Sequence, residues 1–427
     1  MQAQSKAVFV AALMIVVGFG FVVFAALIGV EMESKLMQDN AAPAVAPAAP
    51  TPAPVTNESR FALSKVDVLN LARTDADLGG FDSGFAHGAF GYVLPYRNGN
   101  GTYAKVARFR LDDFNTVQVL DLAKADAELK GFHGGFTDGT WGYVVPFYDS
   151  GAESKLARFR LNDFATVQVL DLSKLDAGLA GFTGGFTDGT HGYVVPNNAA
   201  SNYKRLNGKV ARVRLDDFKT VQVLDLTQSS DPDLKGFYGG FTDGTHGYLV
   251  PQYNGINYHG KVTRFRLDDF ATVEVLDLTK HGVDLKGFRG GFSDGTFGYV
   301  MPYYGGAKGK VTRFRLDDFA TVQVLDLAKF DAGLAGFIGG FTDGTFGYAI
   351  PYNRVSHSKV ARFRLDDFNA VQVLDLARTD ADLRGFIGGF TDGMHGYAVP
   401  FHGGANGKVA RFEVVAHLPR AGWQSSP

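Results

Sequence analysis

The chain contains no cysteine, and it has almost no excess of charge of either sign. Its 427 residues include 42 basic and 44 acidic side chains, which gives a formal net charge of −2. The absence of cysteine excludes disulfide bonds and thiolate metal sites, and it leaves the redox environment of the protein open. The balanced charge argues against a dominant nucleic-acid-binding surface, which would be strongly basic. We therefore expect no nucleic-acid partner.

The longest apolar run lies near the N-terminus. Residues 7–30 form a stretch of 24 residues without a charge, and a helix of that length spans the roughly 30 Å hydrocarbon core of a bilayer. The alternative is a cleaved signal peptide, but the apolar region of such a peptide is usually about 7–15 residues long. Lys6 precedes the run, while Glu31 and Glu33 follow it, and a basic flank favours the cytoplasm.

This pattern predicts a single-pass anchor in the cell membrane, with the lipid bilayer as a partner through residues 7–30. Residues 1–6 would be cytoplasmic, and the rest of the chain periplasmic or extracellular. Residues 31–57 form a linker rich in proline and alanine, which includes "AAPAVAPAAPTPAPV". Such a composition gives an extended, semi-rigid spacer. We expect this linker to hold the globular residues 58–416 away from the bilayer, and residues 417–427 to be a disordered tail.

The globular region is built from one repeated unit. The stretch "GGFTDGTHGYVVP" at residues 184–196 has near copies at six other places. The tyrosine of the repeated "GY" recurs at spacings of 51, 50, 55, 51, 49 and 49 residues, at Tyr92, Tyr143, Tyr193, Tyr248, Tyr299, Tyr348 and Tyr397. A period near 50 residues is typical of a four-stranded propeller blade.

Each unit predicts four strands. "GFTGGFT" and "THGYVVP" flank the turn Asp-Gly, which is a strong hairpin signal. "KVARFRL" and "TVQVLDL" follow, the latter rich in β-branched residues. We predict that the glycine-rich strand is innermost, because pairs such as Gly184 and Gly185 permit seven strands to approach one axis. The flanking Phe182 and Phe186 would then fill the space between blades.

The two ends of the repeat region complete one blade. Residues 66–71 supply an outer strand with no blade before it, and residues 408–415 supply a third strand with no outer strand after it. Joining them closes the ring and leaves no unpaired edge. The sequence therefore predicts an all-β, seven-bladed β-propeller over residues 66–415. An open solenoid would need capping repeats, and none is visible.

The motif order resembles the bacterial YVTN-type propeller repeats of surface-layer and lactonase-like proteins. In those repeats a "DG" turn precedes a "YVAN"-like strand and then a "VSVID"-like strand. The matching letters here are "TDGTHGYVVPN" and "KVARFRLDDF". The double glycine also resembles kelch repeats, although the later aromatic signature of kelch is missing. The resemblance implies the propeller fold and no catalytic residues.

The copies differ at one end of the predicted propeller. The turns "TDG" and "DDF" repeat almost unchanged on one face, and their aspartates fit turn chemistry better than a calcium site. The loops on the other face vary and are rich in Tyr, Asn and Gly, which is typical of binding loops. One further position, directly after Gly-Phe, changes freely between the blades and should face the axis at the varied end. Its residues are Asp82, His133, Thr183, Tyr238, Arg289, Ile338 and Ile387.

Varied chemistry around one mouth predicts an asymmetric ligand-binding pocket, although unconstrained drift of the loops would also produce variation. The candidate ligand-binding residues are Asp82, His133, Thr183, Tyr238, Arg289, Tyr148, Tyr253 and Tyr303. Two other repeated features have structural interpretations. Arginines such as Arg108 should pair with aspartates such as Asp121 on the next strand, and the residue before "GY", histidine in three blades, should pack between blades rather than bind a metal.

No nucleophile elbow, zinc-binding run, phosphate loop or dinucleotide fingerprint occurs. We therefore predict no enzymatic activity, no cofactor and no metal, and a binding module for a protein or glycan partner on the varied face. Two alternatives stay open. One is a lactonase- or hydrolase-like propeller enzyme that uses Asp82, His133 and Arg289 at the axis mouth, because a propeller can assemble a site from several blades. The other is a purely structural surface protein.

Overall fold

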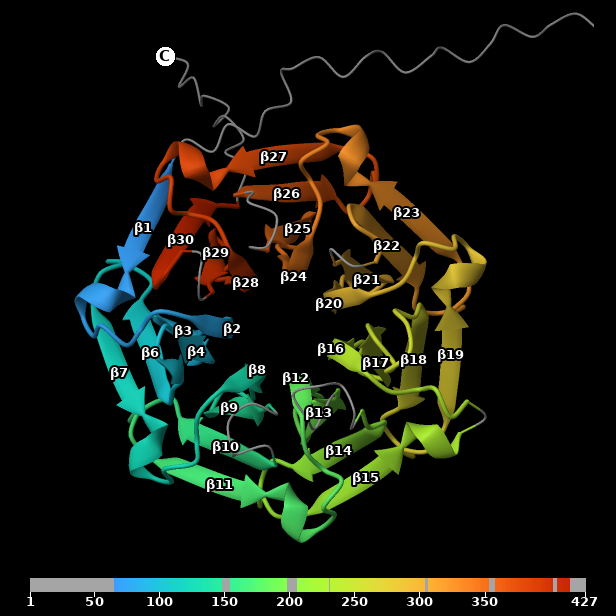
Figure 1. Cartoon of the computed structure of the whole chain (residues 1–427), viewed down its shortest axis with the longest axis horizontal. Coiled ribbons are helices and arrows are strands. Elements are labelled where there is room, and N and C mark those ends of the chain that lie inside the picture. Colours follow the sequence, from blue (N-terminus) through green and yellow to red (C-terminus); the bar gives the residue numbers. More distant parts are fainter. Residues whose placement is uncertain are drawn as a thin grey trace, which may run out of the picture. The chain divides into compact units, whose positions relative to one another are not determined.

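The computed structural model describes residues 65–147, 154–197, 206–229, 231–303, 306–352, 358–401 and 405–414. These residues form seven four-stranded sheets arranged around one axis (Figure 1). The predicted anchor, linker and tail, at residues 7–30, 31–57 and 417–427, lie outside the described residues. Within the described ranges, no helix has the length and apolar character that a membrane span requires.

The strands of each blade follow the predicted order from the axis outward. The innermost strands are β2 (Phe81–His87), β8 (Phe132–Thr137), β12 (Phe182–Thr187), β16 (Phe237–Thr242), β20 (Phe288–Ser293), β24 (Phe337–Thr342) and β28 (Phe386–Thr391). The second strands are β3 (Phe90–Pro95), β9 (Trp141–Pro146), β13 (His191–Pro196), β17 (His246–Pro251), β21 (Phe297–Pro302), β25 (Phe346–Pro351) and β29 (His395–Pro400).

The third strands are β6 (Lys105–Arg110), β10 (Lys155–Arg160), β14 (Lys209–Arg214), β18 (Lys261–Arg266), β22 (Lys310–Arg315), β26 (Lys359–Arg364) and β30 (Lys408–Glu413). The outer strands are β1 (Val66–Asn70), β7 (Val117–Asp121), β11 (Val167–Asp171), β15 (Val221–Asp225), β19 (Val273–Asp277), β23 (Val322–Asp326) and β27 (Val371–Asp375). The short strands β4 (Arg97–Asn98) and β5 (Gly101–Thr102) pair within the loop between β3 and β6.

The ring closes as the sequence predicts. β1 pairs antiparallel with β30, so the sheet order of the last blade is β1-β30-β29-β28. In Figure 1 the blue strand β1 lies beside the red strand β30, which places the two ends of the described chain in one blade. The described strands run from Val66 to Glu413, inside the predicted globular region. Closure leaves no blade with an unpaired third strand.

Each outer strand ends in a single turn of 3-10 helix. An aspartate, or an asparagine in the closing blade, caps this turn by accepting a hydrogen bond from the backbone two residues later, as Asp121 Oδ1 does from Ala123 N at 3.1 Å. The turns are η2 (Leu71–Arg73), η3 (Leu122–Lys124), η4 (Leu172–Lys174), η5 (Leu226–Gln228), η6 (Leu278–Lys280), η7 (Leu327–Lys329) and η9 (Leu376–Arg378).

The predicted cross-strand pairing of arginine with these aspartates is therefore wrong. Arg108 faces Gln118, whereas Asp121 faces Lys105, because Gln118 and Asp121 lie three residues apart and point to opposite faces of the strand. The Arg108 guanidinium is buried between the rings of Phe90 and Phe164, 4.3 Å from each ring centroid.

Arg108 also donates to the backbone carbonyl of Leu161 in the next blade at 2.6 Å. A buried arginine of this kind therefore joins neighbouring blades. Phe90, the residue before "GY", is half-buried against Arg108 and against apolar side chains of blades one and two, which agrees with the predicted packing between blades. A direct arginine–aspartate pair occurs in the closing blade, where Arg411 Nη2 lies 2.6 Å from Asp67 Oδ2. There Asp67 occupies the position that Gln118 has in blade one.

The repeated aspartates of the first turn are structural, as predicted. Asp138 Oδ1 accepts from the backbone nitrogens of Thr140 at 2.8 Å and Trp141 at 2.7 Å, and its Oδ2 accepts from the Tyr143 hydroxyl at 2.7 Å. The tyrosines of "GY" are almost fully buried in every blade. Each such aspartate thus satisfies the turn backbone and the polar end of a core side chain together.

Candidate functional site at the propeller axis

A bulge in every innermost strand directs the varied residue away from the strand pairing. In β12, Phe182 pairs with Pro196 and Gly185 pairs with Val194, so β12 carries one more residue than β13 between these two pairs. The extra length falls at Thr183 and Gly184, and Gly184 has φ = 73°. A bulge of this type bends the strand and re-aims a side chain. The same shift occurs in all seven blades where the inner hairpin is described.

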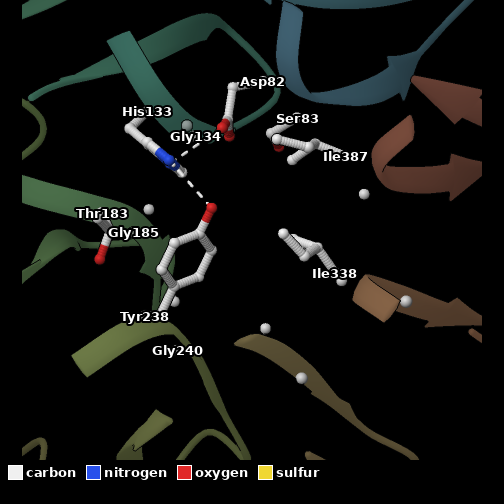
Figure 2. A pocket seen from close by; sticks show the side chains of 18 of the residues that line it. Asp82, Ser83, His133, Gly134, Thr183, Gly185, Tyr238, Gly240, Ile338 and Ile387 are labelled. Atoms are coloured by element: carbon white, nitrogen blue, oxygen red, sulfur yellow. Dashed lines mark hydrogen bonds and ion pairs between the residues drawn. The ribbon is translucent and has the colours of Figure 1, made fainter. Parts of the chain in front are cut away.

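The varied residues form a ring at the axis, which we call the axial ring: Asp82, His133, Thr183, Tyr238, Arg289, Ile338 and Ile387. Figure 2 shows six of them converging from separate blades. The same six side chains are each less than a tenth exposed, although four of them carry polar groups. They line a cavity of about 160 Å³ together with Ser83 and the glycine pairs of the inner strands. Six of the seven varied residues therefore lie at the axis, as predicted.

Three members of the axial ring form a connected polar chain. The hydroxyl of Tyr238 lies 3.0 Å from Nε2 of His133, and Nδ1 of His133 lies 3.1 Å from Oδ2 of Asp82 (Figure 2). These residues come from blades four, two and one. Tyr238 reaches His133 past the intervening blade because that blade contributes Thr183, a short side chain whose hydroxyl donates to the Phe237 carbonyl at 2.9 Å.

Burial determines the protonation state of the tyrosine in this chain. Loss of solvent raises the pKa of Tyr238 well above its ordinary value, and the negative charge of Asp82 raises it further. The phenol therefore keeps its proton at neutral pH and can donate to Nε2 of His133. An imidazole that accepts at Nε2 carries its own proton on Nδ1, beside Asp82.

Asp82 remains incompletely satisfied in this arrangement. Its side chain is 3% exposed, yet its Oδ2 accepts no hydrogen bond from any residue in the described ranges. The contact at 3.1 Å with His133 is thus electrostatic in character. Buried carboxylate oxygens normally have hydrogen-bond partners, so Asp82 is the polar group at the axis that the protein frame leaves unmatched.

A second ring surrounds the axial ring and was not predicted. It consists of the residue that follows the proline of each second strand, and we call it the post-proline ring: Tyr96, Phe147, Asn197, Gln252, Tyr303, Tyr352 and Phe401. Its aromatic members contact one another in sequence around five blades, at centroid distances of 5.9–6.1 Å. In the sequence, each member of this ring is the first residue of a varied loop, and that shared position could have indicated the ring.

The post-proline ring packs directly on the axial ring. Tyr96 and Phe147 lie 5.4 and 4.5 Å from the ring centroid of His133. Asn197 donates to the carbonyl of Phe237 at 2.5 Å. With its amide oxygen facing Arg289, Gln252 accepts from Nη2 at 2.8 Å and from Nε at 3.1 Å. The two rings therefore form one packed unit.

The remaining predicted site residues have different positions. Arg289 stacks on Tyr238 and Tyr303, with its guanidinium carbon 4.6 and 3.8 Å from the ring centroids, and it does not line the axial cavity. Tyr303 thus belongs to the site through Arg289. Tyr253 lies one residue beyond the post-proline ring and packs against Tyr258 in the loop of blade four, at 5.6 Å between centroids. Tyr148 lies outside the described residues.

Ser83 is a further residue that the sequence analysis did not single out. It has φ = 73°, a left-handed conformation that the other six blades assign to the first glycine of the pair. A non-glycine residue in this region is strained by about 1–2 kcal/mol, and such strain is frequent at functional sites. Ser83 lines the cavity next to Asp82, so the departure from the glycine pattern falls in the blade that carries the acidic group.

The described residues contain no group of three or more histidine, aspartate or glutamate side chains that could hold a metal ion. The site is therefore defined by one buried carboxylate, one imidazole, one phenol and two apolar side chains around a small cavity. This combination can bind a small polar group through a hydrogen bond or a charge, and it can also hold and transfer a proton.

No protein-family model matches the chain, and no curated protein matches its sequence. Among solved structures, the crystal structure of the RRP9 WD40 repeats is similar, with a TM-score of 0.55 and 9% sequence identity over 82% of this chain and 97% of that one. At this identity the similarity shows the β-propeller fold alone. No finding assigns the chain to the YVTN-type or kelch families.

Proposed function

We propose that this protein is a binding module that recognises a protein or glycan partner through the varied face of its propeller. The observation that carries the proposal is the division between the two faces. The repeated side chains satisfy each other within and between the blades, whereas the varied residues place a buried carboxylate beside a cavity and expose an apolar side chain, Ile256, in the loop of blade four. Binding rather than chemistry explains both features.

The loop of blade four shows how this face presents contacts. Its residues are ordered by Asn254, whose side-chain oxygen accepts from the backbone nitrogens of Ile256 at 3.1 Å and Asn257 at 2.9 Å. The Tyr253 and Tyr258 rings close the base of the loop. Ile256, at the tip, is 69% exposed. A preorganised loop with an exposed apolar side chain loses little entropy on binding, which favours a recognition role.

The test compares two exposed side chains at opposite ends of the propeller. Ile256 lies on the varied face, and Met394, which is 66% exposed, lies in a first turn of blade seven on the repeated face. The full-length chain is screened in detergent on peptide and glycan arrays, together with the variants Ile256→Ser and Met394→Ser. We expect a ligand whose binding is weakened by Ile256→Ser and unaffected by Met394→Ser. Loss through Met394→Ser alone, or no ligand on any array, contradicts the proposal.

The proposal extends to the N-terminal region. We propose that residues 7–30 anchor the protein in the cell membrane, with the propeller on the periplasmic or extracellular side, because the run is apolar and uncharged over 24 residues. The full chain should then remain with the membrane fraction after an alkaline wash, and a protease added to intact cells or spheroplasts should cleave the propeller region. Release by the wash contradicts the anchor.

Catalysis is the second candidate, and the Asp82–His133–Tyr238 chain favours it. A carboxylate beside an imidazole that contacts a hydroxyl is an arrangement that can move a proton. A hydrolase of this kind should open lactones or esters, and His133→Gln should abolish the turnover while leaving the melting temperature within a few degrees. If no substrate in a lactone and ester panel is hydrolysed above the level of the variant, this candidate is wrong.

A further inference from the structure

Among the side chains that line the axial cavity, His133 is the basic group beside the Asp82 carboxylate, with Nδ1 3.1 Å from Oδ2. His133 can accept a hydrogen bond at Nε2 from the Tyr238 hydroxyl, and in that tautomer its imidazole contributes a dipole rather than a charge. The Arg289 guanidinium stacks on Tyr238 and Tyr303 and donates to Gln252. A carboxylate that is 3% exposed without an opposite charge is unfavourable by several kcal/mol.

The walls of the cavity select for shape. Most of the lining residues are glycines of the inner strands, so the wall of the cavity is largely backbone. A cavity of about 160 Å³ is close to the roughly 150 Å³ that accepts a benzene-sized group. Ile338 and Ile387 give one side of the cavity an apolar surface near Asp82. The space suits a chain of about five or six heavy atoms with an apolar stem and one charged end.

We propose that the axial cavity recognises a primary ammonium group on an unbranched chain, with the Asp82 carboxylate as its counter-ion and Ile338 and Ile387 as contacts for the stem. This inference rests on the proposed binding function and names the chemistry of the ligand. The ammonium would donate to the Asp82 carboxylate, while Nδ1 of His133, 3.1 Å from Oδ2, would hold that carboxylate in place.

Other ligand types fit less well. An anion in this cavity of about 160 Å³ would be repelled by the Asp82 carboxylate, and no lysine or arginine among the lining residues would offset that repulsion. A divalent metal needs several oxygen or nitrogen ligands, and the described residues offer no such group. A cation much larger than a benzene ring exceeds the cavity of about 160 Å³.

The ammonium can come from a free amine or from a lysine side chain of a partner protein, and the experiment separates these sources. Calorimetric titration of the full-length chain in detergent uses n-butylamine against n-butanol, and an acetylated Gly-Gly-Lys-Gly-Gly amide against the same peptide with norleucine. We expect the charged member of at least one pair to bind and the neutral member not to bind. Binding of the amine alone indicates a small ligand, and binding of the peptide indicates a protein partner.

The variant Asp82→Asn removes the charge with almost no change of shape. We expect it to weaken ammonium binding by at least about tenfold and to keep or raise the melting temperature, because the unmatched buried charge is gone. Asp317→Asn is the matched control, since that carboxylate is 63% exposed on the surface. Equal binding of charged and neutral probes by the unmodified chain overturns the inference without relying on any variant.

A marked loss of stability in Asp82→Asn also overturns the inference, because it would show that the carboxylate is already compensated in the free protein. The array experiment tests the proposed recognition function independently of the ammonium titration. Array binding that depends on Ile256 can persist when no ammonium binds, and in that case only the chemistry assigned to the axial cavity is wrong. Ammonium binding without any array ligand supports the axial site and contradicts recognition through the loop of blade four.

Discussion

Two aspartates at opposite ends of the inner strands show how the frame differs from the site. Asp294, in the first turn of blade five, accepts from the backbone nitrogens of Thr296 and Phe297 and from the Tyr299 hydroxyl, at 2.6–2.8 Å. Asp82, at the other end of the equivalent strand in blade one, is more deeply buried and has an oxygen without a donor among the described residues. The repeated residues satisfy the hydrogen bonds of the propeller scaffold, which we call the frame. The varied residues at the axis do not have this role.

Blade one differs from the other six blades in its first turn and in its inner strand. Its first turn, Ala86-His87-Gly88, lacks the aspartate, so the Tyr92 hydroxyl has no turn carboxylate to bond and lies 3.5 Å from the Leu161 carbonyl of the next blade. Its inner strand carries Ser83 in place of a glycine and Asp82 beside it. The departures from the repeat therefore gather in the blade that supplies the acidic group of the site.

The largest effect that separates frame from site should come from the glycine ring. Gly290→Ala places a Cβ 2.8 Å from the Gly339 Cα at φ = 77°, whereas the nearest atom to a Cβ on Gly388, at φ = 67°, is the Ser83 Cα at 3.9 Å. We expect Gly290→Ala to lower the free energy of unfolding by about 3 kcal/mol, from strain and overpacking together. Gly388→Ala should lower it by about 1 kcal/mol, from strain alone.

Denaturant unfolding of the full chain measures both glycine variants. Equal losses of stability in the two variants would show that the inner strands approach each other as closely beside Ser83 as they do at Gly290. The wider spacing beside Ser83 would then have no energetic consequence. Ser83→Gly completes the set. It should raise stability by about 1 kcal/mol, because the same backbone conformation is then occupied without strain.

The sequence predicted the frame well because the repeat reports it seven times. The glycine pair, the Asp-Gly turn and the lone strands at both ends specify an inner strand, a hairpin and a closed ring. The register of the outer hairpin was not predicted, because the pairing of Arg108 with Gln118 depends on the conformation of the "LDDF" turn, where Phe114 has φ = 45°.

The site was predicted only in part. The bulge explains why the varied position faces the axis, and the glycines indicated that position. The contact between His133 and Tyr238 joins residues 105 positions apart and depends on the short Thr183 between their blades. Such a contact follows from side-chain lengths around a ring, which no local pattern encodes. The aromatic character of Tyr253 indicated that residue as a ligand contact, whereas its neighbour Gln252 is the residue in contact with Arg289.

The next effect concerns a turn of the frame. Asp294→Ala removes three hydrogen bonds, two to the backbone and one to the buried Tyr299. We expect the free energy of unfolding to fall by about 2–3 kcal/mol, with ligand binding on the varied face unchanged. Denaturant unfolding gives the first quantity and the array signal gives the second. A loss of binding at full stability would reverse the assignment of the two faces.

His259 is a second buried polar side chain on the varied face, and neither of its ring nitrogens has a hydrogen-bond partner among the described residues. Its variants show whether such a group also takes part in binding. Its ring packs on Phe237 at 5.6 Å between centroids, and burial lowers its pKa to about 4. The unfolded chain, with an ordinary pKa of about 6.5, therefore binds more protons between these values, and stability falls as the pH falls through this window. The expected loss is about 2 kcal/mol between pH 6.5 and pH 4.5.

Replacing His259 by glutamine should flatten the pH dependence of unfolding in that window, while binding on the varied face stays the same. The carboxylates whose pKa is lowered in the folded protein act in the same direction but at more acidic pH, below their ordinary value near 3.8. A pH profile that is identical in the unmodified chain and in His259→Gln would show that His259 titrates normally, and that the packing around Phe237 admits its charged form.

The smallest effect should come from Asp317, whose position is aspartate in five of the six complete outer turns but lies at the surface. It pairs with Arg315, and the two side chains are 63% and 40% exposed. Exposed ion pairs contribute about 0–1 kcal/mol, so we expect Asp317→Ala to change the free energy of unfolding by less than about 0.5 kcal/mol. Comparison with Asp294→Ala in the same blade separates repetition from stabilisation. A loss as large as that of Asp294→Ala would mean that the Arg315 pair holds the outer turn, in which Phe319 has φ = 48°, and that this turn contributes to the frame as much as the inner turn does.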